Sequence, residues 1–253
     1  MDDPAYSDYP LTDMLKVGDF RSQLLGTLRA IKPVLEEVGV MVAGSEVPNL
    51  LEPGARSTLV VSQDVDIAVP VSRHAGVKRR LREVQDLMPS ADEPSVWVPM
   101  RAGLIEVNFI GMDRETERAG ETYVFDDTEM PLLVFGHLGF LSPGEPVFAE
   151  DLVIPVPRPA GLLLEKLVTD RSGEKGDRDL LVVLGLALVA KPEDFDELED
   201  LYRQLSKDLQ YSVRSNLTLL SLLQRRNGMP DPTLHRRLVA DLLTRLEGAQ
   251  AEP

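Results

Sequence analysis

The sequence predicts an α+β fold, in which a mixed β-sheet flanked by helices is followed by a helical region. Two observations predict it. Short runs rich in β-branched residues, separated by turn residues, occur between residues 40 and 156. After Pro155, Pro157 and Pro159, almost every segment has apolar residues at helical spacing. We therefore expect a sheet-containing domain over residues 1–157 and a helical domain over residues 158–253.

The individual elements follow from apolar spacing and turn residues. Residues 13–38 have helical spacing, with Thr12 as the expected N-cap and Pro33 expected to kink or split the helix. A short strand over 40–43 precedes a loop over 46–55, and residues 96–99 and 104–110 should form a hairpin. The other expected strands cover 58–62, 65–71, 122–125, 132–135 and 152–156. The other expected helices cover 73–88, 160–170, 178–189, 194–205, 211–226 and 233–246.

The composition excludes several kinds of protein and site. With 253 residues, 43% of them hydrophobic and 27% charged, the chain can bury a substantial core. It has no cysteine, which excludes disulfides, thiolate zinc sites and thiol nucleophiles. The longest uncharged apolar run, residues 180–190, is about half of the ~20 residues that a membrane span needs. Because the acidic N-terminus lacks the apolar core of a signal peptide, we expect a cytoplasmic protein without a membrane partner.

The net charge and the few histidines narrow the chemistry further. A formal charge of -15 opposes the coating of nucleic acid, but it permits a nucleotide or an RNA end in a local basic pocket. His74, His137 and His235 stand far apart in the sequence, and we expect surface or packing roles for them. Any metal should therefore be held by oxygen ligands, which favours Mg²⁺ or Mn²⁺.

The segment Asp64-Val65-Asp66 is the central chemical motif. On an extended backbone, residues two apart point to the same face, so both carboxylates project together while Val65 points into the core. Two adjacent carboxylates repel each other unless a cation neutralises them. A magnesium ion would neutralise them and would also hold phosphate oxygens of a substrate. Alone, such a pair is also compatible with an ordinary acidic strand edge.

Neighbouring residues strengthen the functional interpretation. Gly44-Ser45 follows the short strand over 40–43, and a glycine there would let a phosphate approach the backbone while the serine donates a hydrogen bond. Ser62 precedes Asp64 by two residues. The alternating segment 104–109 places Glu106 on the polar face of another strand, where it could bind metal or accept a proton from a hydroxyl.

This order of motifs resembles the polymerase-β-like nucleotidyltransferases: Gly-Ser, a loop, Ser-x-Asp-x-Asp, and then a strand with a central acid. The later part of the chain resembles the helical half of the AbiEii-type group, which includes abortive-infection and toxin nucleotidyltransferases. The residues that carry this second likeness are PAGLLLEK at 159–166, Arg171, and Arg178-Asp179-Leu180. The likeness spans roughly residues 40–190.

The resemblance implies roles for the residues of the first domain. Asp64 and Asp66 would bind the metal, with Glu106 as the third acid of the catalytic and metal site. Gly44 and Ser45, together with Ser62, would hold the phosphates of the nucleotide.

Residues of the helical domain complete the implied site. Lys166 would reach the triphosphate, and Arg178 and Asp179 would line the opposite wall. The reaction would move a nucleotide from an NTP to an acceptor hydroxyl on an RNA or tRNA end, a protein or a small molecule. The group also implies a toxin of a toxin-antitoxin pair, with an antitoxin protein as partner.

Two positions keep an alternative open. Val60 stands where the family usually has an arginine, and Glu106 stands where an aspartate is more usual. A nucleotide- or partner-binding module of the same fold, without catalysis, would also explain the sequence.

Overall fold

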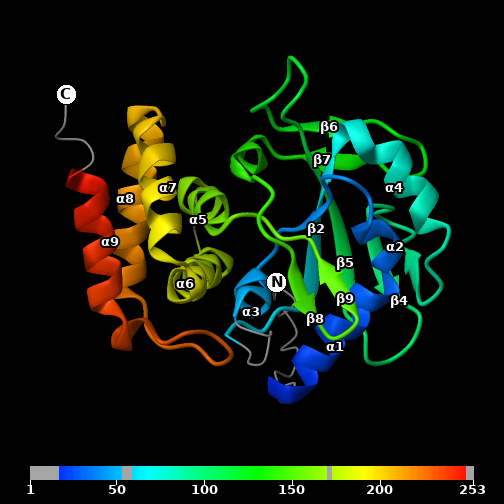
Figure 1. Ribbon diagram of the computed structural model, residues 1–253, viewed down its shortest axis with the longest axis horizontal. Coiled ribbons are helices and arrows are strands. Elements are labelled where there is room, and N and C mark those ends of the chain that lie inside the picture. Colours follow the sequence, from blue (N-terminus) through cyan, green and yellow to red (C-terminus); the bar gives the residue numbers. More distant parts are fainter. Residues whose placement is uncertain (1–16, 53–58, 170–172, 249–253) are drawn as a thin grey trace, which may run out of the picture.

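The computed structural model describes residues 17–52, 59–169 and 173–248. Figure 1 shows a half built around a β-sheet and a half built from helices, as the sequence predicts. The fold is α+β, with a mixed sheet and flanking helices in the N-terminal part and helices alone from residue 159 onward.

The sheet contains both parallel and antiparallel pairs of strands. Strand β2 (Asp64–Pro70) pairs in parallel with β5 (Glu106–Met112) along its whole length. The main path runs β1-β2-β5-β4-β3, with β1 (Met41–Val42), β4 (Val96–Pro99) and β3 (Leu87–Pro89). Strand β7 (Leu132–Val134) extends the sheet from β5 and pairs with β6 (Tyr123–Phe125). The sheet is mixed because β2, β5 and β7 pair in parallel, whereas β1 and β4 are antiparallel to the strands that they flank.

Four helices accompany the sheet: α1 (Val17–Ala30), α2 (Lys32–Leu35), α3 (Val47–Leu51) and α4 (His74–Leu81). The predicted helix over 13–38 is divided as expected, since Pro33 lies in the first turn of α2, where its missing N–H costs no hydrogen bond. The start of that predicted helix, with Thr12, lies outside the described residues.

Three predicted elements are wrong. The loop expected over 46–55 contains the helix α3 at Val47–Leu51. The helix expected over 73–88 ends at Leu81, because the chain returns at Leu87 to pair with β4 as an edge strand. Residues 59–62 form no strand, although 58–62 was expected to be one. The side chain of Asn49 instead binds the backbone there, accepting from the N–H of Val60 at 2.8 Å and donating to its carbonyl at 2.6 Å. This clamp fixes the segment that leads into Asp64.

The helical half contains α5 (Pro159–Val168), α6 (Gly173–Val189), α7 (Pro192–Arg203), α8 (Lys207–Leu222) and α9 (Arg236–Gly248). A small hairpin of β8 (Val147–Ala149) and β9 (Leu152–Ile154) precedes it. Figure 1 shows α5 and α6 between the sheet and the outer helices. Helix α5 is buried from Ala160 onward, and α6 packs on α3. One apolar core therefore runs through both halves and holds α5 and α6 against the sheet.

No helix in the described ranges is long and apolar enough to cross a membrane.

Candidate functional site

The two aspartates predicted to form the site lie side by side at the start of β2. Val65 and Ile67, which alternate with them, are fully buried, so Asp64 and Asp66 share the opposite face of the sheet. In the parallel register, Glu106 lies opposite Asp64 and Asn108 lies opposite Asp66. The pairing of β2 with β5 thus brings four polar side chains to one face.

Asn108 bridges the two aspartates, a role that the sequence interpretation missed. Its Nδ2 donates to Asp64 Oδ2 at 3.0 Å and to Asp66 Oδ1 at 3.2 Å. Its Oδ1 is buried and has no hydrogen-bond partner. The alternation that placed Glu106 on the polar face also places Asn108 there, two residues on, and that signal could have identified it.

A chain of hydrogen bonds connects Ser45 of the Gly-Ser motif to Asp64. Ser45 Oγ donates to Ser62 Oγ at 2.9 Å, and Ser62 Oγ donates to Asp64 Oδ1 at 2.8 Å. Gly44 lies against the acids themselves, because a Cβ added there would overlap the Glu46 carboxyl and lie 2.9 Å from Asp66 Oδ2. The absence of a side chain at Gly44 therefore allows the loop to lie against the acids, and the approach of a phosphate to this backbone stays a prediction.

Glu46 is a buried acid of the site that the sequence interpretation also missed. Its side chain is fully buried, and its Oε1 accepts a hydrogen bond from the backbone N–H of Asp66 at 3.3 Å. Burial, followed by the charge of Asp66, raises the pKa of Glu46 well above its ordinary value. A glutamate directly after Gly-Ser looked like a loop residue in the sequence, and only the turn into α3 carries it inward.

Helix α5 brings Lys166 to the same place from the other half of the chain. Lys166 is 8% exposed, and its Nζ lies 3.2 Å from Oε2 of the neighbouring buried Glu165. Glu165 Oε1 also lies 3.2 Å from His137 Nε2. His137, expected to be a surface or packing residue, thus joins the site, whereas His74 is a packing residue whose Nε2 lies 2.8 Å from the Met130 carbonyl oxygen.

Helix α6 supplies Arg178 and Asp179, which line one cleft together with Asp64 and Asp66. Arg178 Nη2 donates to the carbonyl of Val61 at 2.7 Å, so a guanidinium reaches the segment just ahead of Asp64. The resemblance leads us to expect an arginine at Val60, and in this chain a guanidinium reaches the neighbouring residue from another helix. Arg171, part of the quoted motif, lies outside the described residues.

These side chains line one cleft of about 580 Å³ between the sheet and the helices. All of the predicted site residues except Gly44 line it, and Gly44 lies directly behind the acids. The predicted members are Ser45, Ser62, Asp64, Asp66, Glu106, Lys166, Arg178 and Asp179. The sequence therefore identified eight residues of one cavity, although they lie up to 134 positions apart (Ser45 to Asp179).

The electrostatics of the cleft favour a bound cation. Burial and then the charge of Asp64 raise the pKa of Asp66, while Lys166 and the Asn108 amide oppose the rise. Burial and then Asp64 also raise the pKa of Glu106. Carboxylates held this close are destabilised as anions, and a divalent cation would relieve that repulsion.

The residues fit a magnesium ion that shares its coordination with a substrate. Within the described ranges, no three acidic or histidine side chains form a ready-made metal cage, so Glu106 does not complete a triad with Asp64 and Asp66. Magnesium commonly uses one or two carboxylates and takes its other ligands from phosphates and water. A half-turn of the Asn108 amide would also point its unpartnered Oδ1 toward the two aspartates.

Comparisons with known proteins leave the family unassigned. No family model matches the chain, and no curated protein matches it. A crystal structure of JHP933 from Helicobacter pylori aligns with 93% of this chain and 95% of that chain, at 14% sequence identity and a TM-score of 0.39. A likeness this weak carries no argument, and the resemblance to nucleotidyltransferases stays a prediction.

Proposed function

We propose that this chain is a metal-dependent nucleotidyltransferase, which moves a nucleotide from an NTP to an acceptor hydroxyl. One observation carries the proposal: paired aspartates on β2 share a cleft with Lys166 and Arg178, which come from the helical half. The cleft volume lies within the range of ordinary small-ligand sites. Acids for a metal and cations for phosphates, facing each other across a cleft, are what nucleotide transfer requires.

The side chains would divide the work as follows. Asp64 and Asp66 would hold the metal, which neutralises phosphate charge when bound. Lys166 would bind the triphosphate, and Ser45 and Ser62 would orient Asp64 through their hydrogen bonds.

Group transfer then needs one bond to form and one to break. The acceptor oxygen bonds to the α-phosphorus, the bond from that phosphorus to the oxygen bridging to the β-phosphorus breaks, and pyrophosphate leaves. The hydroxyl proton passes to the carboxylate of Glu106, which is partly exposed at the edge of the cleft.

Pyrophosphate release tests this proposal. The parent protein, incubated with each of the four NTPs, magnesium and an acceptor mixture of RNA, protein and small hydroxyl compounds, should release pyrophosphate. Glu106→Gln should lower the rate by about 10²–10⁴-fold, the usual contribution of a general base. The exposed Asp126→Asn should behave like the parent. An unchanged rate for Glu106→Gln would exclude Glu106 as the base.

A second candidate function is a nucleotide- or partner-binding module without catalysis. The observation that favours it is the amide of Asn108, which occupies the position between the two aspartates where a carboxylate base would also fit. This candidate predicts magnesium-dependent nucleotide binding without pyrophosphate release from any mixture. A role as a toxin controlled by an antitoxin, and action in the cytoplasm, rest on the sequence alone and belong to the proposal.

A further inference from the structure

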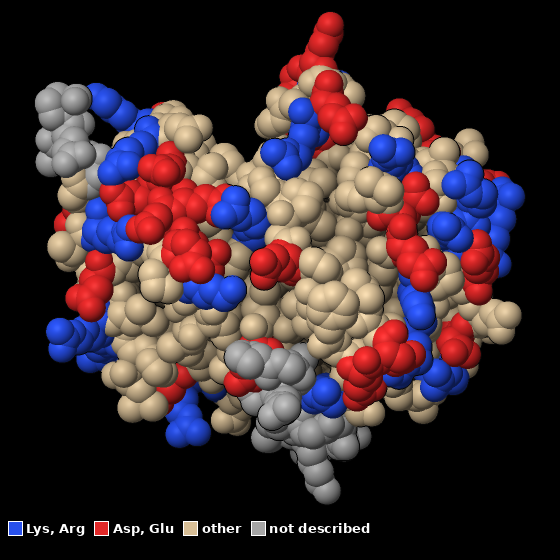
Figure 2. Space-filling model, viewed as in Figure 1, with Lys and Arg blue, Asp and Glu red and all other residues tan. Residues whose placement is uncertain are grey.

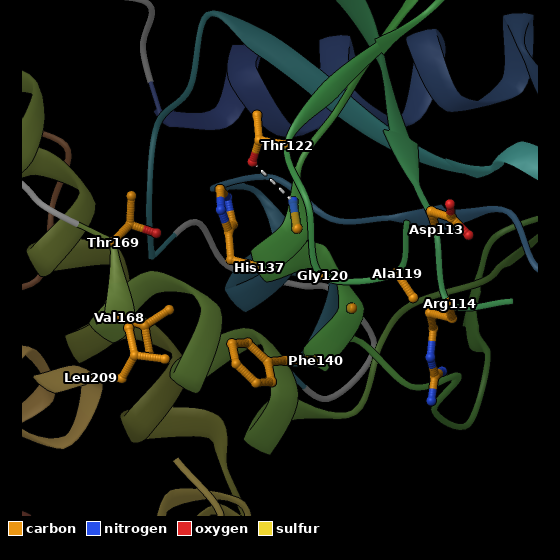
Figure 3. Close-up of a pocket in the computed structure, with 12 residues that line it drawn as sticks. Asp113, Arg114, Ala119, Gly120, Thr122, His137, Phe140, Val168, Thr169 and Leu209 are labelled. Carbon is orange, nitrogen blue, oxygen red and sulfur yellow. Dashed lines mark hydrogen bonds between the residues drawn. The ribbon is translucent and has the colours of Figure 1, made fainter. Parts of the chain in front are cut away.

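A second cavity of about 570 Å³ adjoins the nucleotide cleft. The two cavities share His137 and Thr169 as a common wall. Figure 3 shows the second cavity, with Arg114 and Ala119 on one side, Val168, Thr169 and Leu209 on the other, and the Phe140 ring between them. Figure 2 shows a notch in the surface between the helical half and the projecting loop that precedes β6.

The chemistry of this second cavity differs from that of the nucleotide cleft. Phe140, Val168 and Leu209 give it an apolar body, whereas acids and cations line the cleft. The acid at its edge, Asp113, is occupied within its own loop: it accepts hydrogen bonds from the Thr116 hydroxyl and from the Tyr123 hydroxyl, the latter at 2.7 Å. An apolar ligand would thus be accepted without stranding a buried carboxylate.

Arg114 supplies the one arginine or lysine side chain among the described residues that line the second cavity. Its Nη1 donates to the Leu141 carbonyl at 2.9 Å, which fixes the guanidinium, and it forms no ion pair in the described part of the chain. An arginine carries five N–H donors, so an anionic group of a ligand could bind there.

The shared wall carries a positioned imidazole. His137 Nε2 lies 3.2 Å from Oε1 of Glu165, a carboxylate that is 3% exposed. A buried carboxylate restrains the orientation of the ring, so His137 presents a fixed polar edge where the two cavities meet. A hydroxyl group at this wall would face the nucleotide cleft.

We infer that the second cavity binds the acceptor, and that the acceptor is a small hydroxyl compound with an apolar body and an anionic group. This inference rests on the proposed function. The anion would bind Arg114, the apolar body would pack on Phe140, and the hydroxyl would lie at the wall of His137 and Thr169. His137 is then a positioning residue for the oxygen that bonds to the α-phosphorus as pyrophosphate leaves.

The surroundings of the cavity disfavour an RNA acceptor. Glu115, Glu117 and Glu121 are exposed on the loop that carries Arg114, and the chain has a formal charge of -15. Successive phosphates of an RNA would meet these carboxylates, whereas a single anionic group would meet only the guanidinium.

Filling the cavity from Gly139 tests the inference. Gly139 lines the cavity, and a Cβ added there meets nothing within 4 Å, so Gly139→Leu adds a bulky apolar group to the lining without displacing the backbone. Gly248→Leu is the matched control, because a Cβ there also meets nothing within 4 Å and Gly248 lies at the end of α9. The probe is 1-anilinonaphthalene-8-sulfonate, which joins aromatic rings to one sulfonate.

The probe should bind the parent and the Gly248→Leu variant equally, and Gly139→Leu about tenfold or more weakly. Arg114→Gln should weaken binding about tenfold through loss of a charge-assisted hydrogen bond. Arg118→Gln, in the same loop but stacked on Tyr123, should bind like the parent. Equal binding of the probe by Gly139→Leu and the parent would overturn the inference, whether or not the protein binds NTP.

The transfer reaction supplies the second arm. With labelled NTP and 4-hydroxyphenylacetate or a short RNA as acceptor, the inference predicts transfer to the small phenol that Gly139→Leu abolishes while magnesium-NTP binding is retained. Transfer to RNA that Gly139→Leu leaves unchanged would overturn it. Failure of the parent to bind any NTP would instead refute the proposed function. The titration with the probe does not test that function, because it contains no NTP.

Discussion

The neutral amide of Asn108 lies between the two paired aspartates and contacts both. Asn108 donates to both carboxylates, and its hydrogen bond to Asp66 favours the charged form of that carboxyl. The arrangement is also open to a cation, because an amide can present either nitrogen or oxygen.

Replacing this amide by a carboxylate makes the need for a cation measurable. Asn108→Asp should lower the unfolding free energy by about 1–3 kcal/mol in the absence of metal, because a third aspartate then joins Asp64, Asp66 and Glu106 on one face. Excess magnesium should raise its Tm more than that of the parent, since a ligand that binds only the folded state stabilises it. The exposed Asn227→Asp is the control. An equal magnesium effect on the parent and on Asn108→Asp in thermal unfolding would contradict a cation site here.

The backbone of Gly44 lies directly against the acids of the site. A methyl group there would overlap the carboxyl of Glu46, which is fully buried and has little room to move. Gly44→Ala should therefore cost about 1–3 kcal/mol of unfolding free energy in a denaturant titration. Gly139→Ala, where a Cβ meets nothing, should change it by less than about 0.5 kcal/mol. Similar values for both variants would show that the loop is not packed against the acids.

At this scale the sequence revealed the acids of a strand but not their partners. Asp64 and Asp66 could be predicted because alternation with buried Val65 fixes their common face. Glu46 could not, because its burial depends on how the chain turns after Gly44. His137 could not, because its partner Glu165 lies on a helix of the other half.

Hydrogen bonds from side chains to the backbone connect the helices of the site to the segment that precedes β2. Asn49 of α3 binds the backbone of Val60, and Arg178 of α6 binds the carbonyl of Val61. These contacts replace the strand that the sequence predicted over 58–62. An apolar run there looked like a strand because periodicity records burial, and burial was provided by packing on α6 rather than by pairing in the sheet.

Helix α4 is tied to the segment before β7 by an ion pair with a defined pH dependence. Lys78 Nζ donates to both carboxylate oxygens of Asp127, at 2.8 and 2.9 Å, and this lowers the pKa of Asp127 from 3.8 to about 2. A carboxyl whose pKa is lower in the folded state than in the unfolded state stabilises the fold at pH values above its unfolded-state pKa. This contribution disappears as the pH falls from 3.8 toward 2.

Unfolding at several pH values tests this pair. Parent protein should exceed Asp127→Asn in unfolding free energy by a constant amount above about pH 5, and the difference should shrink as the pH falls through 3.8 toward 2. The neighbouring exposed Asp126→Asn should show no such pH-dependent difference. A difference that stays constant down to pH 2 would show that Lys78 does not pair with the charged carboxylate.

In the whole molecule, the cleft exists because two halves of the chain share one core. Asp64, Asp66 and Glu106 come from β2 and β5, and the cations Lys166 and Arg178 come from α5 and α6. The division into a sheet-containing part and a helical part could be predicted from the sequence, since most strands and helices have their own periodicity, but α3, β3 and β8 could not. The predicted boundary between two domains says less about the site than the continuous core does. The predicted site lies between the two halves and needs residues from both.

The second cavity, which we propose binds the acceptor, is likewise built from segments that lie apart in the sequence. Its lining comes from the loop before β6, the short 3₁₀ helix Gly136–Phe140, the end of α5 and the start of α8. No local sequence motif joins these four segments, so only the folded molecule reveals them as one cavity.

Calorimetric titration of the four NTPs, with and without magnesium, tests the central claim most directly. The parent protein and the exposed Asp126→Asn control should bind at least one NTP only when magnesium is present. The folded Asp64→Asn, Asp66→Asn double variant should lose that binding, because the carboxylates that hold the cation are gone. Binding by the double variant that equals binding by the parent, or no binding of any NTP by the folded parent, would contradict the proposed nucleotide site.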